Sequence, residues 1–302
     1  MAREKICIMT DCACDLPKSI LKIYNIQLVD FYIETNEGKF QDIHEITAEN
    51  VFEYLLIEGK TIKTSPPSVE EFIRYFIKQL SQYDEIIYIA LTSKISRSLE
   101  FAIQAATKMR MLDKRIHIFD SKHISTGTGL IALKAAEMAR ENKTSQEILL
   151  ELEKMCNEIS ATFLIQDLDY LCRNGRVDKR LKTICDFLNL HLVLQMKDGF
   201  LKIKTFKIGN YEKSMIRYMK KELKNISEEN IEKLCVTYSG VNVQMLKKLK
   251  WSFKNIAHID SIMTIKASAT TSGNSGPQSI GLFFIKNKPL NEKSLKKVKE
   301  IT

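Results

Sequence analysis

The sequence has no apolar run of the roughly 18 or more residues that a membrane-spanning helix needs. The opening residues, MAREKICIMTDC, carry no signal-peptide core, because their apolar run is short and fits a strand better. The seven cysteines are odd in number and scattered, without a repeated C-x-x-C framework, which argues against a disulfide scaffold. These absences predict a cytoplasmic protein without stable membrane insertion.

Several motifs of catalysis and cofactor binding are also missing. Neither G-x-x-x-x-G-K-[ST] nor G-x-G-x-x-G occurs, so nucleotide binding is not supported. There is no G-x-S-x-G elbow, and Asp120, Ser121 and His123 are too close in sequence to assume the geometry of a catalytic triad. Cys12 and Cys14 form a lone C-x-C, which is a weak metal signal. We therefore expect no catalytic residue, no metal and no cofactor.

Charge of one sign is in excess, since the formal net charge is +9. Lysine runs such as YMKKELK and MLKKLKWSFK could contact nucleic acid, but arginine is scarce in them and few aromatics are interleaved. Each run also fits the solvated face of an amphipathic helix, with Met219, Leu223, Leu246 and Leu249 turned inward. Nucleic acid is not the expected partner, and an acidic protein partner stays open.

Strand and helix signals alternate in the first half of the chain and change their order afterwards. The β-α-β order predicts an N-terminal α/β domain at residues 1–158, with a mostly parallel sheet flanked by helices. Residues 159–302 are expected to form an α+β domain with antiparallel strands, because Asp198-Gly199 predicts a tight hairpin turn. The ligand site is expected in or near the cleft between these two domains. Strands are predicted at 5–10, 26–35, 85–91, 116–120, 161–168, 191–208 (a hairpin), 231–240, 258–267 and 278–285, and helices at 16–24, 47–59, 69–80, 98–112, 127–143, 145–159 and 241–255.

Hydroxyl-bearing residues gather where first-half strands end, which is where open α/β sheets bind ligands. In TIKTSPPSVEEF, Ser68 and Glu71 form a capping box for the following helix, which leaves Thr64 and Ser65 unexplained. Asp15 is predicted to cap the helix that Pro17 starts. The segment GTGLIALKAAEMA could hold an anion or pack closely on the sheet. Uncharged donors over an apolar interior suit a carboxylate on a long apolar body.

Seven segments in the same order resemble the DegV family of bacterial fatty-acid-binding proteins, whose members include the fatty-acid-carrying subunit of fatty acid kinase. TDCACDLP resembles T-D-S-x-x-D-L-P, KTSPPSVEEF resembles K-T-S-x-P-S, and LTSKISRSLEFA resembles S-S-x-L-S-G-T-Y-x-x-A. FDSKHISTGTGL, LDYLCRNGRV, LNLHLVLQMKDG and SGNSGPQSIGLFF are similar to the family's later segments. The resemblance covers essentially the whole chain.

The resemblance implies a buried pocket for one long-chain fatty acid such as palmitate, and no catalytic activity of this chain. It implies that the carboxylate is held by hydroxyls of Thr64, Ser65, Ser93 and Ser96. It also places Arg97, Arg176 and Asn274 near the head group or on a partner surface. A fatty acid kinase would phosphorylate the bound acid, with ATP and metal on that partner.

The chain departs from the family pattern at five positions. The family's histidine is Asn274, its last glycine is Gln278, its Ser-Gly pair reads Ser96-Arg97, the arginine after the hairpin is Ile208, and the serine of the first motif is Cys12. Two alternatives stay open: a small-ketone kinase-like subunit of the same fold, with His123 on a predicted cleft loop, and a lipid-responsive or DNA-binding regulator.

Overall fold

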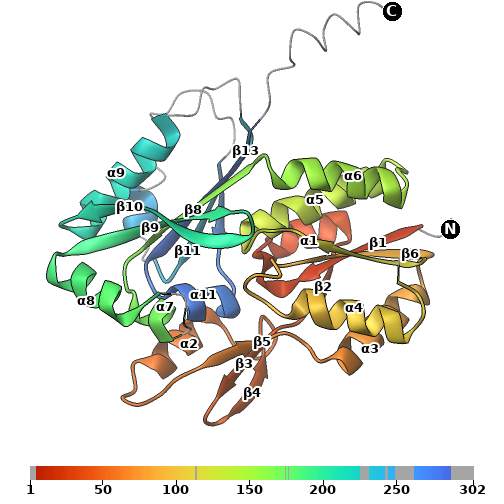
Figure 1. Cartoon of the computed structure of the whole chain (residues 1–302), viewed down its shortest axis with the longest axis horizontal. Coiled ribbons are helices and arrows are strands. Elements are labelled where there is room, and N and C mark those ends of the chain that lie inside the picture. The colour runs from red at the N-terminus through yellow and green to blue at the C-terminus, as the bar shows by residue number, and fades with distance from the viewer. Residues whose placement is uncertain are drawn as a thin grey trace, which may run out of the picture.

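The computed structural model describes residues 5–112, 114–173, 175, 177–224, 231–241, 244–248 and 262–286. Figure 1 shows two sheets side by side with helices around them, and a smaller sheet below the junction. The predicted fold class, a mostly parallel N-terminal sheet with helices and a C-terminal part with antiparallel strands, is confirmed. The predicted helix at 241–255 lies largely outside the described residues.

The N-terminal sheet has the order β2-β1-β6-β7 and is parallel throughout. Its strands alternate between two faces: Ile8, Ile87 and Ile89 pack into one buried cluster, whereas Met9 and Tyr88 pack into another. Helices therefore cover both faces, as expected for a parallel sheet. The elements are β1 (Ile6–Asp11), η1 (Cys12–Cys14), α1 (Lys18–Tyr24), β2 (Gln27–Val29), α3 (Val69–Leu80), β6 (Glu85–Ala90), α4 (Ser98–Lys108), β7 (Ile116–Asp120), α5 (Thr126–Arg140) and α6 (Ser145–Cys156).

The C-terminal sheet has the order β10-β9-β8-β13-β11-β12 and is antiparallel except for the β11–β12 pair. The predicted turn between β9 and β10 is confirmed, because Asp198 and Gly199 have φ of 54° and 79°. The elements are β8 (Ile159–Ile165), α7 (Asp169–Arg173), α8 (Lys179–Phe187), β9 (Leu190–Lys197), β10 (Phe200–Ile208), α9 (Tyr211–Lys224), β11 (Ile231–Ser239), β12 (Ile262–Lys266), α11 (Ala269–Ser275) and β13 (Ser279–Lys286).

A third, antiparallel sheet of order β4-β3-β5 corrects one prediction. The single strand predicted at 26–35 is two strands, β2 and β3, in different sheets. The capping box predicted for Ser68 and Glu71 is confirmed on α3. Thr47 caps α2. The elements are β3 (Tyr32–Thr35), β4 (Gly38–Gln41), α2 (Ala48–Leu55) and β5 (Lys63–Ser65).

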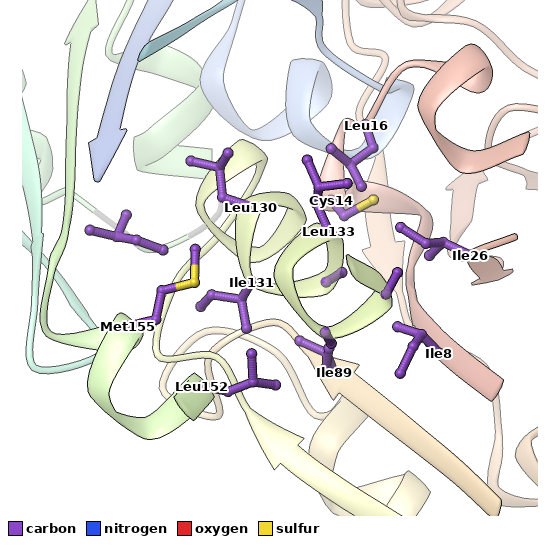
Figure 2. Close-up of a cluster of buried hydrophobic side chains, with 14 of the residues drawn as sticks. Ile8, Cys14, Leu16, Ile26, Ile89, Leu130, Ile131, Leu133, Leu152 and Met155 are labelled. Carbon is purple, nitrogen blue, oxygen red and sulfur yellow. The ribbon is translucent and has the colours of Figure 1, made fainter. Parts of the chain in front are cut away.

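Helix α5 lies between the two large sheets and is buried along most of its length. Figure 2 shows Leu130, Ile131 and Leu133 pointing from different sides of this helix into one cluster. The same cluster includes Ile89 of the first sheet and Phe283 of the second. Because α5 contributes to a core shared by both sheets, the two halves of the chain are packed against each other.

The glycines at the start of α5 serve close packing. A Cβ on Gly129 would lie 2.6 Å from the carbonyl oxygen of Cys14, and one on Gly127 would lie 3.0 Å from the Cβ of His123. A side chain at position 129 would clash with the backbone of η1, and one at position 127 would crowd His123, so glycine lets α5 lie close to η1 and to the loop between β7 and α5. Of the two interpretations of this segment, these contacts favour packing over an anion site.

Candidate functional site

A cavity of about 420 Å³ is lined by loops that follow strands of the N-terminal sheet, by strand β5, by strands of the C-terminal sheet and by α11. This volume is within the range of about 300–1,000 Å³ that is usual for small-molecule pockets. Much of the lining is apolar, and it is interrupted by hydroxyls and one amide. Apolar lining residues include Phe31, Leu91, Phe101, Phe163, Leu194 and Ile280.

Strand β5 brings Thr64 and Ser65 to the cavity, but their hydroxyls differ in what they contact. Successive side chains of a strand point to opposite faces. The Ser65 hydroxyl donates to Glu34 Oε1 at 2.7 Å, so its hydrogen is already used. Thr64 Oγ1 accepts a hydrogen bond from Asn274 Nδ2 at 3.1 Å. The Thr64 hydrogen finds no acceptor among the described residues and can be donated to a ligand.

The loop between β6 and α4 brings Ser96 to the cavity and leaves Ser93 outside its lining. Ser96 Oγ accepts from the backbone N–H of Ser98 at 3.1 Å, and its hydrogen has no acceptor within the described chain. Ser93 is exposed, and its hydroxyl donates to Asp120 Oδ2 at 2.6 Å. Of the two serines of this loop that were predicted as head-group ligands, the structure places only Ser96 in the cavity lining with Thr64.

Asp11 positions this loop from the adjacent strand β1. Its carboxylate is fully buried and accepts from the backbone N–H of Leu91 at 2.8 Å and from Ser98 Oγ at 3.1 Å, as well as from the Tyr88 hydroxyl. Burial raises the pKa of Asp11 to about 6, and these hydrogen bonds partly offset the rise. Asp11 is not among the lining residues, so it acts on the site through the loop.

Two further buried carboxylates, Asp42 and Asp15, hold α11. Asp42 accepts from the backbone N–H groups of Ala269 and Thr270 at 3.0 and 2.8 Å. Asp15 accepts from the backbone N–H of Ser268 at 2.8 Å and from the hydroxyls of Thr271 and Ser125. Burial raises the pKa of Asp15 to about 6. Neither carboxylate is among the lining residues.

The predicted role of Asp15 as the cap of the following helix was wrong. The N-cap position of α1 is Pro17, and no side chain makes a capping bond there. The Asp15 backbone is in the left-handed region, with φ of 57°, and its carboxylate is turned toward α11 and α5. The Asp15 carboxylate binds the backbone N–H of Ser268, 253 positions away in sequence, instead of capping α1. The local sequence pattern gives no sign of such a distant partner.

The remaining predicted site residues differ in where they lie. Asn274 lines the cavity, and its Nδ2 also donates to the carbonyl oxygen of Thr270 at 2.8 Å, so both amide hydrogens are used. Arg97 borders the cavity but is exposed; its guanidinium donates to both Glu100 oxygens at 3.0 and 3.1 Å and lies over the Phe101 ring. Arg176 lies outside the described residues.

Sequence reasoning missed the contribution of α11 to the lining. Thr270, Thr271 and Ser275 all border the cavity beside Asn274. The hydroxyls of Thr270 and Ser275 are buried and have no hydrogen-bond partner among the described residues. The segment ATTSGNS is rich in residues that favour loops and caps, so it carries no helical signal in the sequence. Its only visible clue is the density of hydroxyls.

The structure places His123 away from the cavity. It is buried, and its Nε2 donates to the carbonyl oxygen of Cys156 at 3.0 Å. Burial lowers its pKa, so the ring is neutral. Among the described histidines, which exclude His258, none is a lining residue.

Within the described part of the chain, no group of three or more His, Cys, Asp or Glu side chains could hold a metal ion. No described helix is long and apolar enough to cross a membrane.

The geometry defines an α/β protein with two large sheets and a small third one, and with an apolar cavity that has hydroxyl donors on its wall. A family model described as "Uncharacterised protein, DegV family" matches residues 5–287, and the chain belongs to this family. A DegV domain-containing protein of Caldanaerobacter subterraneus is 31% identical over 93% of this chain and 99% of its own length. A second relative, from Staphylococcus aureus, is 28% identical over 92% of this chain and 98% of its own.

Solved structures share the fold. A DegV family protein from Thermus thermophilus, described by its fatty acid binding, aligns with a TM-score of 0.83 at 24% identity, over 94% of this chain and all of that one. A DegV family protein from Eubacterium eligens, loaded with heptadecanoic acid, aligns with a TM-score of 0.80 at 19% identity, over 93% and 100%. A stearic acid-binding protein from Eubacterium ventriosum aligns at 0.78 and 24%, over 92% and 97%.

Proposed function

We propose that this protein binds one long-chain fatty acid in the cavity, with its carboxylate on the hydroxyls of Thr64 and Ser96. The observation that carries the proposal is a single cavity that combines an apolar lining with hydroxyls whose hydrogens are free within the described chain. Asn274 supports it by occupying the acceptor side of Thr64, which leaves that hydroxyl to donate. The fatty acids bound by DegV structures of the same fold add support.

The energetics agree with this ligand. At about 0.8 kcal/mol per buried CH₂, the roughly fourteen methylenes of palmitate contribute about 11 kcal/mol before ordering costs. The head group then needs its hydrogen bonds satisfied, because an unpaired buried carboxylate is costly.

The proposal includes a role as a cytoplasmic carrier that presents the acid to a fatty acid kinase and has no catalytic activity of its own. Neutral hydroxyl donors leave the carboxylate available to an incoming phosphoryl group, and ATP and metal would be supplied by the partner. The small-ketone kinase alternative requires a histidine that binds substrate. His123 is buried outside the lining, which disfavours this alternative. No observation favours a DNA-binding regulator.

The experiment is native mass spectrometry of the full chain purified from bacteria, followed by lipid extraction. We expect one fatty acid per chain in the wild type, and its loss in a Thr64→Val/Ser96→Ala variant. Ser93→Ala is the matched control, because Ser93 is a serine of the same loop outside the lining. Adding ATP and a kinase subunit should then yield acyl phosphate. A ligand-free wild type that takes up neither palmitate nor oleate sinks the proposal.

A further inference from the structure

Strand β10 forms one edge of the C-terminal sheet. Among the described strands only β9 pairs with it, so the peptide groups on its outer side have no strand partner there. The strand is nine residues long, from Phe200 to Ile208. The Ile208 carbonyl oxygen accepts from Arg217 Nη2 at 2.6 Å, so α9 closes one end of this edge. Figure 1 shows β10 at the margin of the sheet, with α9 and α8 on either side of it.

One face of β10 is apolar and exposed. Ile203, Phe206 and Ile208 lie opposite alternate leucines of β9, and therefore on the sheet face that α8 covers. A bulge between Ile203 and Thr205 keeps Ile203 and Phe206 on this same face although they are three positions apart. Ile203, Phe206 and Ile208 are 47%, 38% and 65% exposed, so α8 does not cover them. We call these three residues the apolar face of the edge.

The opposite side of the edge is basic. Lys204 pairs with Glu222 of α9, whereas Lys207, Arg217 and Lys221 have no acidic partner among the described residues. Burial lowers the pKa of Lys207, and the charge of Lys221 lowers it further. These cations are therefore close enough to repel one another. We call Lys207, Arg217 and Lys221 the basic face of the edge.

The charge of this edge selects what can pair with it. A second copy of the chain would bring the lysines of β10 against lysines, and like charges that lie directly opposite destabilise a strand pair. A lipid bilayer could meet only one side of the sheet, whereas the basic and apolar faces lie on opposite sides. An extended acidic segment matches both faces, because the side chains of a strand alternate between its two sides.

We propose that the outer edge of β10 binds an extended segment of another protein in which acidic and apolar residues alternate. The segment adds to the sheet as a further strand, and its backbone pairs with the outer peptide groups of β10. Its carboxylates lie against the basic face and its apolar side chains against the apolar face. This interaction does not depend on the fatty acid proposed for the cavity.

The test is fluorescence anisotropy of the full chain with two labelled peptides of nine residues, the length of β10. In the first peptide glutamate and valine alternate, and in the second the same residues are grouped in two blocks. The alternating peptide should bind at least about tenfold more tightly, because it alone places all its valines on one side. Its binding should also slow the hydrogen exchange of the β10 amides.

Lys207→Glu/Lys221→Glu should weaken binding of the alternating peptide about tenfold. Lys18→Glu/Lys22→Glu is the matched control, because it changes the net charge equally at two exposed lysines of α1, and it should bind as the wild type does. Ile208→Ser tests the apolar face at an exposed side chain and should weaken binding severalfold, even if the charge variant does not fold.

Three results overturn the proposal: no binding of the alternating peptide, equal binding of the two peptides, or an equal loss in both charge variants. A fourth is binding to phosphatidylglycerol vesicles that Lys207→Glu/Lys221→Glu abolishes, with no peptide effect on exchange in β10. The edge would then belong to a lipid surface.

Discussion

Two groups of polar residues line the cavity, and they are held in different ways. The loop wall is the β6–α4 loop with Ser96, and the helix wall is α11 with Thr270, Asn274 and Ser275. Asp11 holds the loop wall from a strand that pairs directly with β6. Asp42 and Asp15 hold the helix wall from 227 and 253 positions away in sequence.

The two walls therefore depend on different parts of the fold. The loop that carries Ser96 is set by neighbouring strands of one parallel sheet. The helix wall is in place only when the two halves of the chain pack together, because its anchors come from the other half. The cavity should therefore be most sensitive to changes at the anchors of α11.

The largest effect is expected from Asp42→Ala, which would break the helix wall. Two buried backbone N–H groups would lose a charged acceptor, each bond contributing about 1.5–3 kcal/mol, so the free energy of unfolding should fall by roughly 3–6 kcal/mol. Fatty acid binding should fall with it. Denaturant unfolding and palmitate titration measure both. Asp42→Asn keeps one acceptor oxygen and should lose less; an Asp42→Ala variant within about 1 kcal/mol of wild type would contradict this.

A smaller, pH-dependent effect is expected from Asp11→Asn at the loop wall. The pKa of Asp11 is raised from 3.8 to about 6 by burial, so the folded protein takes up a proton at a higher pH than the unfolded chain does. Protonation of Asp11 in the folded state adds to the free energy of unfolding. This contribution is fully present below about pH 4 and is lost as the pH rises through 6. Asparagine does not titrate, so from pH 4 to 7 the variant should gain stability relative to wild type by up to about 3 kcal/mol.

Denaturant midpoints at several pH values measure this difference. Asp15→Asn should show the same trend, because burial also raises the pKa of Asp15 to about 6. A surface substitution such as Glu53→Gln provides the baseline, since Glu53 is exposed on α2. A wild-type minus variant difference that stays constant with pH would refute the argument.

The smallest effect is expected from Arg97→Ala at the edge of the cavity. The guanidinium is exposed and paired with exposed Glu100, and such pairs contribute little because water screens them. Palmitate affinity should change less than about twofold. Arg97→Lys serves as the control that keeps the charge. A large loss of affinity in Arg97→Ala but not in Arg97→Lys would place this charge in head-group binding.

Predictions from local patterns succeeded where the interactions are local. The Ser68–Glu71 capping box and the Asp198-Gly199 turn form as predicted, because each depends on residues only a few positions apart. The parallel sheet follows from alternating strand and helix signals. The strand predicted at 26–35 was wrong in its continuity, since its two parts pair with different partners.

The candidate site was predictable only in part. The resemblance to a known family led to Thr64 and Ser96, both of which line the cavity, but also to Ser93, which the structure leaves outside. Ser93 and Ser96 belong to the same loop between β6 and α4. The buried carboxylate of Asp11 on β1 holds this loop through Leu91 and Ser98, which lie on either side of the two serines in sequence. The hydroxyls of α11 had no sequence signal, because that helix is short and made of poor helix formers.

By itself, the sequence determined the order of strands and helices, the caps, the hairpin turn and the family, since these depend on short-range patterns and motif order. Only the tertiary structure decided which hydroxyls face the cavity and which are already used by protein partners. The buried carboxylates of Asp11, Asp42 and Asp15 fix these positions, because they bind a loop and a helix that lie 80 to 253 positions away in sequence. A buried carboxylate is costly unless it accepts hydrogen bonds, and the donors that satisfy it can come from any segment that the fold brings close, however far away in sequence.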